Sequence, residues 1–166
     1  MKKLIVFCLF VLIGLDSCSK KNDSKSDLEF KDIFRADADA ETDIREAIAR
    51  ASLEQKRVLL LFGANWCPWC QRLHHLIETD PNVRDYLARH FELVLVDLGK
   101  RDRNMEIDAR YGSPNTLGIP VFVVLDRDGT RLYIQETGSL EYPKDHPKKG
   151  HDPVKVMLFL QTWATS

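Results

Sequence analysis

The sequence predicts an α/β domain with a central mixed β-sheet flanked by helices. Three apolar runs of strand length support this prediction: VLLLF at 58–62, FELVLVDL at 91–98 and VFVVL at 121–125. Such runs are typical of strands that are buried on both faces of a sheet. Helical patterns separate the runs in the order αβαβαββα, so we expect helices to flank the sheet.

Three helices are expected in the first half of the domain. Asp43 and Glu46 resemble a capping box, and apolar residues after Asp43 share one helical face. A second helix is expected over 67–79, with a proline in its first turn, where proline is tolerated. Asp80 then resembles an N-cap in front of a proline, which predicts a third helix over 81–90.

The second half contains a short helix, a hairpin and a final helix. The polar stretch 100–115 is expected to be irregular, apart from a helical piece at 105–111. The DRDG sequence at 126–129 predicts a tight turn, after which 130–136 returns as an antiparallel strand. Asp152, followed by proline, starts the last helix.

Length and composition are those of one globular domain. The chain has 166 residues, of which 44% are hydrophobic and 30% charged. Its formal net charge is −1, so no basic field recruits nucleic acid, and we expect no nucleic-acid partner. We place the domain at 33–166.

The N-terminus has the pattern of an export signal. Lys2 and Lys3 precede an uncharged apolar run at 4–15, which spans only about 18 Å as a helix. That length is too short for a bilayer core of roughly 30 Å. We therefore assign 1–17 to a signal peptide and the polar residues 18–32 to a flexible tether.

The sequence Leu15-Asp16-Ser17-Cys18 resembles the lipobox of bacterial lipoproteins. The resemblance implies cleavage before Cys18 and a diacylglyceryl group on its sulfur. Lipid chains would hold the protein on a membrane of the cell envelope, facing the periplasm or the outer surface. The alternative is cleavage by the general signal peptidase near Ser17, which leaves Cys18 as a free thiol.

Two cysteines remain in the domain. Cys8 leaves with the signal peptide and Cys18 would be consumed by lipid, so only Cys67 and Cys70 remain for a working dithiol or a small-loop disulfide. Backbone N–H groups and the helix dipole favour a thiolate at a helix N-terminus. We therefore expect Cys67 to be an exposed nucleophile.

Two stretches resemble the thioredoxin family. VLLLFGANWCPWC at 58–70 has the family's strand, tryptophan and Cys-x-x-Cys, and YGSPNTLGIPVFVVLDRDG at 111–129 has its Gly-Ile-Pro ahead of a strand. Gly138 matches the glycine after the hairpin, and the resemblance spans about 42–163. It implies a thioredoxin-like fold, a thiol–disulfide oxidoreductase and a cis peptide bond at Pro120.

The resemblance also implies roles for individual residues. Cys67 attacks a client disulfide and Cys70 resolves the mixed disulfide. Apart from the resemblance, His74 lies four residues after Cys70, near its helix face, and is either a candidate for proton transfer or an ordinary helix histidine. Five residues are expected to shape the substrate groove: Trp66, Pro68, Trp69, Ile119 and Pro120.

The chain also departs from the family. Thioredoxins carry a buried aspartate six residues before the first cysteine and a lysine on the neighbouring strand, and here Leu61 and Leu93 occupy these positions. Pro68 and Trp69 between the cysteines favour an intermediate reduction potential, roughly −250 to −150 mV. We therefore expect a reductase or isomerase rather than a strong oxidant.

No organic cofactor or metal is expected, because the electrons reside on the two sulfurs. The expected partners are exported client proteins with cysteines and a membrane redox partner that recycles the dithiol. Two alternatives stay open. Cys67, Cys70, His74 and His75 form a string that suits copper binding or metallocentre assembly. Alternatively, the disulfide is inert and the domain is a non-catalytic interaction module.

Overall fold

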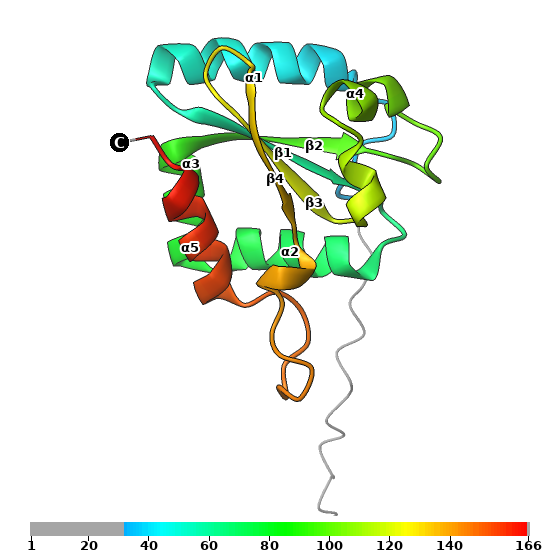
Figure 1. Ribbon diagram of the computed structural model, residues 1–166, viewed down its shortest axis with the longest axis vertical. Coiled ribbons are helices and arrows are strands. Elements are labelled where there is room, and N and C mark those ends of the chain that lie inside the picture. The colour runs from blue at the N-terminus through cyan, green and yellow to red at the C-terminus, as the bar shows by residue number, and fades with distance from the viewer. Residues whose placement is uncertain (1–31, 166) are drawn as a thin grey trace, which may run out of the picture.

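A four-stranded sheet forms the centre of the molecule (Figure 1), in a computed structural model that describes residues 32–165. The strands are β1 (Arg57–Gly63), β2 (Phe91–Asp97), β3 (Val121–Leu125) and β4 (Arg131–Glu136). The helices are α1 (Ala40–Glu54), α2 (Pro68–Thr79), α3 (Pro81–His90), α4 (Met105–Arg110) and α5 (Pro153–Trp163), with short 3-10 helices η1 (Pro114–Leu117) and η2 (Gly138–Leu140). The predicted elements are therefore present in the predicted order.

The sheet is mixed, as the sequence predicts. Its strand order is β2-β1-β3-β4, with β1 parallel to β2 and antiparallel to β3, while β3 and β4 are antiparallel. The parallel pair is joined through α2 and α3, and the DRDG turn joins the antiparallel pair β3 and β4. The chain therefore leaves β1 directly into the helix that carries the Cys-x-x-Cys sequence.

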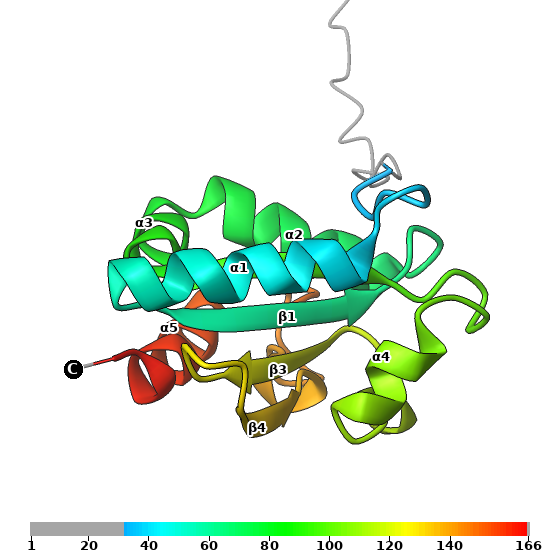
Figure 2. The same ribbon diagram turned by 90° about the horizontal axis from the view of Figure 1, so that it is seen from above.

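Helices cover both faces of the sheet (Figures 1 and 2). Side chains of α2, α3 and α5 pack on the face that contains Leu59 and Leu61. Side chains of α1 and α4 pack on the face that contains Leu60 and Phe62, and Figure 2 shows α1 lying over β1. Because both faces are covered, the apolar residues of β1 are fully buried.

The first helix starts earlier than the sequence pattern predicts. Its N-cap is Asp39, whose carboxylate accepts hydrogen bonds from the backbone N–H and the hydroxyl of Thr42. The predicted capping box at Asp43 and Glu46 is therefore wrong. Asp39 takes the role because it stands one turn earlier with a partner three residues on, and Asp43 instead pairs with Arg35.

The N-terminal assignments lie outside the described residues. This holds for the signal peptide 1–17, for Cys18 and for all of the 18–32 tether except its last residue. Export and lipidation therefore stay predictions. Within residues 32–165, no helix combines the length and the apolar character needed to cross a membrane.

A buried carboxylate fastens the segment that leads to Pro120. Asp108 on α4 is 2% exposed, and its two oxygens accept hydrogen bonds from the backbone N–H of Asn115 at 3.0 Å and from its side-chain amide at 2.5 Å. Asn115 lies in η1, which directly precedes the Gly118-Ile119-Pro120 turn. The contact therefore fixes the start of that turn relative to α4.

Replacing this carboxylate should destabilise the fold strongly. Asp108→Ala leaves the buried donors of Asn115 without an acceptor, so we expect the free energy of unfolding to fall by about 3 kcal/mol. Urea unfolding measures the change. The matched control is Glu106→Ala on the exposed side of the same helix, which should cost less than about 0.5 kcal/mol. Equal losses in the two variants would contradict this role.

Candidate active site

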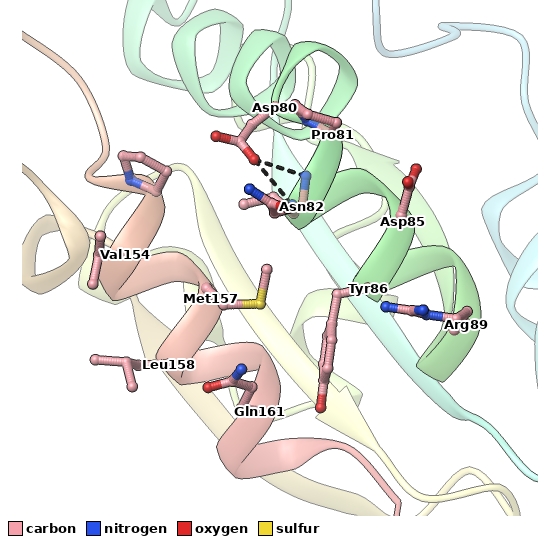
Figure 3. A pocket seen from close by; sticks show the side chains of 12 residues that line it. Asp80, Pro81, Asn82, Asp85, Tyr86, Arg89, Val154, Met157, Leu158 and Gln161 are labelled. Carbon is pink, nitrogen blue, oxygen red and sulfur yellow. Dashed lines mark hydrogen bonds between the residues drawn. The ribbon is translucent and has the colours of Figure 1, made fainter.

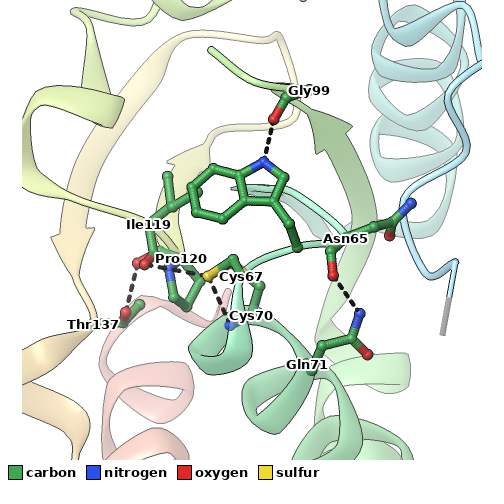
Figure 4. The surroundings of a disulfide bond; sticks show 9 residues. Asn65, Cys67, Cys70, Gln71, Gly99, Ile119, Pro120 and Thr137 are labelled. Carbon is green, nitrogen blue, oxygen red and sulfur yellow. Dashed lines mark hydrogen bonds between the residues drawn. A yellow bond between two sulfur atoms is a disulfide. The ribbon is translucent and has the colours of Figure 1, made fainter. Parts of the chain in front are cut away.

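The two cysteines form a disulfide at the N-terminus of α2 (Figure 4). Cys67 is the N-cap residue in an extended conformation, and Pro68 opens the helix at its first position. The backbone N–H of Cys70 points to the sulfur of Cys67 at a distance of 3.1 Å. After reduction, this N–H and the helix dipole would stabilise a thiolate on Cys67.

The dithiol lies at the bottom of the site rather than on its surface. Cys67 is only 3% exposed and Cys70 is fully buried, so the prediction that Cys67 is exposed is wrong. The physical reason is the turn opposite, because the carbonyl oxygen of Ile119 lies 3.6 Å from the sulfur of Cys67. The backbone of Ile119 therefore covers the sulfur of Cys67.

The turn opposite the dithiol has the predicted cis peptide bond between Ile119 and Pro120. Thr137, buried at the end of β4, donates a hydrogen bond from its hydroxyl to the carbonyl oxygen of Pro120 at 2.5 Å. Figure 4 shows this bond beside the disulfide. The backbone of Ile119 is thus held next to Cys67, while its role in binding substrate stays a prediction.

Trp66 forms the exposed edge of the site. Its side chain is 52% exposed, yet its indole N–H donates a hydrogen bond to the carbonyl oxygen of Gly99 at 2.6 Å. The turn that carries Gly99 is itself fixed, because the buried carboxylate of Asp97 accepts bonds from the Gly99 N–H and from Arg103. The indole therefore offers a fixed apolar surface beside Cys67.

Trp69 is less exposed than Trp66, although both are next to a cysteine in the sequence. It is half-buried, and its ring meets the ring of His151 edge-on at a centroid distance of 6.0 Å. The guanidinium of Arg72 lies 5.0 Å from the centroid of the same ring. Trp69 is therefore tied to the segment before α5, and an exposed aromatic patch would consist of Trp66 alone.

His151 is buried, although it lies in the polar segment 142–153. It is 4% exposed, and neither ring nitrogen has a hydrogen-bond partner. Burial, reinforced by the positive charge of Arg72, lowers the pKa of His151 from 6.5 to about 4. The imidazole is therefore neutral at physiological pH.

Supporting polar contacts around the dithiol were not predicted from the sequence. Asn65 accepts a bond from the N–H of Phe34 and donates one to its carbonyl oxygen, both at 2.8 Å. Gln71, buried on α2, donates from its amide to the carbonyl oxygen of Asn65 at 3.1 Å. The pairing of segments 31 residues apart has no periodic signal in the sequence.

Glycine is required at the end of β1. A Cβ atom at Gly63 would lie 3.0 Å from the sulfur of Cys70 and would collide with the ring of Phe34. Leu61, at the position of the thioredoxin aspartate, is fully buried on the same face of the sheet as Cys70. Cys70 therefore lies in an apolar environment.

The metal-binding alternative gains nothing from the geometry of the described residues. Within residues 32–165, no group of three or more His, Cys, Asp or Glu side chains is arranged to hold a metal ion. His75 is exposed and lines a cavity with Arg72. His74 is half-buried on α2, one turn after Cys70, and its role in proton transfer stays a prediction.

A cavity of about 760 Å³ between α3 and α5 lies away from these residues (Figure 3). Tyr86 and Met157 line its walls, and none of the predicted site residues does. In Figure 3 the carboxylate of Asp80 is occupied by hydrogen bonds to the first turn of α3. Asp80 therefore acts as a helix cap there, and we assign this cavity no chemistry.

The burial of His151 predicts a pH dependence of stability. Because its pKa is about 4 in the folded state and near 6.5 when unfolded, the unfolded chain binds the extra proton between these values. Protonation in this range favours the unfolded chain. The contribution of His151 to the free energy of unfolding is therefore constant above pH 6.5 and becomes increasingly unfavourable as the pH falls towards 4. Lowering the pH from 7 to 4.5 should therefore cost the His151 site roughly 2–3 kcal/mol of unfolding free energy.

Urea unfolding at both pH values tests this, with His151→Phe as the variant that removes the titration. His75→Phe on the exposed side of α2 is the control and should keep the wild-type pH dependence. The same loss of stability in wild type and His151→Phe would show that this histidine does not cause it.

Comparisons with known proteins agree with this geometry. A family model described as thioredoxin-like matches residues 39–127, which is more than half of the chain. The structure of a disulphide isomerase from Xylella fastidiosa Temecula1 is 32% identical with a TM-score of 0.68, and the match covers 78% of this chain and 95% of that chain. A comparison with curated proteins finds no match.

Two more distant structures share the fold. A thioredoxin from Thermus thermophilus is 22% identical with a TM-score of 0.50, covering 71% of this chain and 81% of that chain. The reduced C-terminal domain of DsbD from Neisseria meningitidis is 20% identical with a TM-score of 0.52, covering 74% and 96%. With its mixed sheet, its Cys-x-x-Cys disulfide and these matches, the chain belongs to the thioredoxin-like family.

Proposed function

We propose that the protein is a thiol–disulfide oxidoreductase that acts on exported proteins through Cys67 and Cys70. The observation that carries the proposal is the placement of the disulfide. It lies at the N-terminus of α2 and faces the carbonyl oxygen of Ile119 at 3.6 Å. An extended client segment that pairs with this backbone would bring its own disulfide against Cys67.

The reaction begins from the reduced protein. The Cys67 thiolate attacks one sulfur of the client disulfide, a new S–S bond forms between them, and the other client sulfur leaves as a thiolate. The thiolate of Cys70 then attacks Cys67, restores the Cys67–Cys70 disulfide and releases the second client thiolate. Two electrons thus move from the protein to the client, and the client thiolates take up protons.

The environments of the two sulfurs support an order of reaction in which Cys67 attacks the client first. Cys67 receives the N–H of Cys70 and the end of the helix dipole, so its thiolate is the better stabilised of the two. Cys70 is fully buried beside Gly63 and cannot meet a large client directly. Cys67 therefore attacks, and Cys70 resolves from within the protein.

Reduction or isomerisation fits better than strong oxidation. The 32% identical structure from Xylella fastidiosa is that of a disulphide isomerase, which supports this choice by similarity. The signal-like N-terminus and the lipobox-like sequence support an activity at the cell envelope, with a lipid anchor at Cys18. A membrane redox partner would then return electrons to the dithiol, and no organic cofactor takes part.

Cysteine variants test the proposal directly. Cys67→Ser should abolish reduction of a peptide disulfide, because no thiolate remains at the helix N-terminus. Cys70→Ser should accumulate a mixed disulfide between Cys67 and the substrate, seen as a mass increase on a non-reducing gel. Wild-type rates in Cys67→Ser would contradict the mechanism, and an inert interaction module would keep its binding function in that variant.

The reduction potential of the Cys67–Cys70 pair tests the proposed direction of electron flow, from the protein to the client. Equilibration of the Cys67–Cys70 pair with glutathione should give roughly −250 to −150 mV, because Pro68 and Trp69 replace the Gly-Pro found in thioredoxin. Exchange of these two residues for Gly-Pro serves as the control and should lower the value. A wild-type potential above about −130 mV would indicate a strong oxidant and contradict the proposed direction.

A further inference from the structure

A basic cavity lies beside the candidate active site. Its volume is about 580 Å³, and it lies between α2 and the segment 142–151 that hangs below α2 in Figure 1. Three of its lining residues carry permanent positive charge, namely Arg72, Lys148 and Lys149, and none is acidic. Glu141, the carboxylate that is electrostatically coupled to Arg72, is not part of the lining. The cavity therefore presents a positive field to an anionic group.

The walls of the cavity are held by backbone contacts. The Tyr142 N–H donates to the carbonyl oxygen of Gly150 at 3.0 Å, and Glu141 and His151 form an isolated antiparallel bridge. The ammonium of Lys149 donates to the carbonyl oxygen of Lys144 at 2.9 Å. These contacts close residues 142–150 into a loop with an ordered backbone, and this loop carries Lys148 and Lys149.

His151 forms part of the buried wall of this cavity. It lines this cavity, it is more than nine-tenths buried, and both of its ring nitrogens lack a hydrogen-bond partner. Both nitrogens are shielded from solvent, so a carboxylate in the cavity would be bound by the neighbouring cations Arg72, Lys148 and Lys149.

The cavity adjoins the dithiol through Trp69. This residue stands between Cys67 and Cys70, and its ring contacts both His151 and Arg72. A client whose cysteine reaches Cys67 would therefore extend over Trp69 towards the cavity. Covalent capture at the sulfur and ionic binding in the cavity would then act on one segment.

We propose that this cavity binds the carboxylate side chains of an acidic segment next to the reacting cysteine of the client protein. The inference rests on the proposed oxidoreductase function and adds the substrate class to it. Acidic residues beside the client cysteine would raise the rate of mixed-disulfide formation. Several weak ion pairs with the cavity would speed the association of the client with the protein.

The first test compares two peptide disulfides that differ only in flanks of Asp and Glu or of Asn and Gln. Reduced protein in excess is mixed with each, and the second-order rate constant of disulfide reduction is measured at low salt. We expect the acidic peptide to react about tenfold faster, with the ratio falling towards one at 0.5 M salt. The double variant Lys148→Gln/Lys149→Gln should lose this ratio.

The matched control is Arg45→Gln, which removes a cation from α1 on the opposite face of the sheet. It should keep the ratio. Equal rates for the two peptides in wild type would overturn the proposed acidic specificity and leave the oxidoreductase intact. Failure to reduce either peptide would instead overturn the oxidoreductase function itself.

The second test needs no redox chemistry. A cysteine-free acidic peptide is titrated into the oxidised protein, and the ring resonances of His151 are followed by NMR. We expect saturable shifts that are lost in the double lysine variant. No shift would overturn the proposal. Tighter binding of inorganic phosphate or of phosphatidylglycerol vesicles than of the peptide, lost in the same variant, would overturn it in favour of a phosphate ligand.

Discussion

The junction between β1 and α2 is the constraint on which the rest of the site depends. β1 is buried on both faces, so its direction is fixed by the two cores that cover it. The strand ends at Gly63, where the absence of a side chain leaves room for the sulfur of Cys70 and the ring of Phe34. The next helix then starts with Cys67 as its cap. The sheet therefore determines where both sulfurs lie.

Three separately anchored elements surround this junction. The turn at Ile119 is held by Thr137, the indole of Trp66 is held by the backbone of Gly99, and Trp69 is held against His151. Each anchor comes from a different part of the chain, so the surroundings of the disulfide are fixed without a bound ligand. In the proposed function, this preorganisation would let binding energy be used for placing a client sulfur rather than for ordering the site.

The sequence predicts the elements because their signals are local. The apolar runs identify the strands, and Asp80 and Asp152 were recognised as caps from the proline that follows each. The resemblance to thioredoxins located the cis bond at Pro120. The burial of Cys67 was missed, as was that of His151, because both depend on contacts with distant segments. Periodicity carries no information about such contacts.

Thiol trapping in the cell tests the central claim most directly. Cells that produce the full chain are quenched with acid, free thiols are labelled with a mass tag, and the redox state of Cys67 and Cys70 is read from the shift. A reductase or isomerase needs a free thiolate on Cys67, so the account predicts a mainly reduced pair. A pair that stays fully oxidised in growing cells would contradict it, because no electrons would then be available for client disulfides.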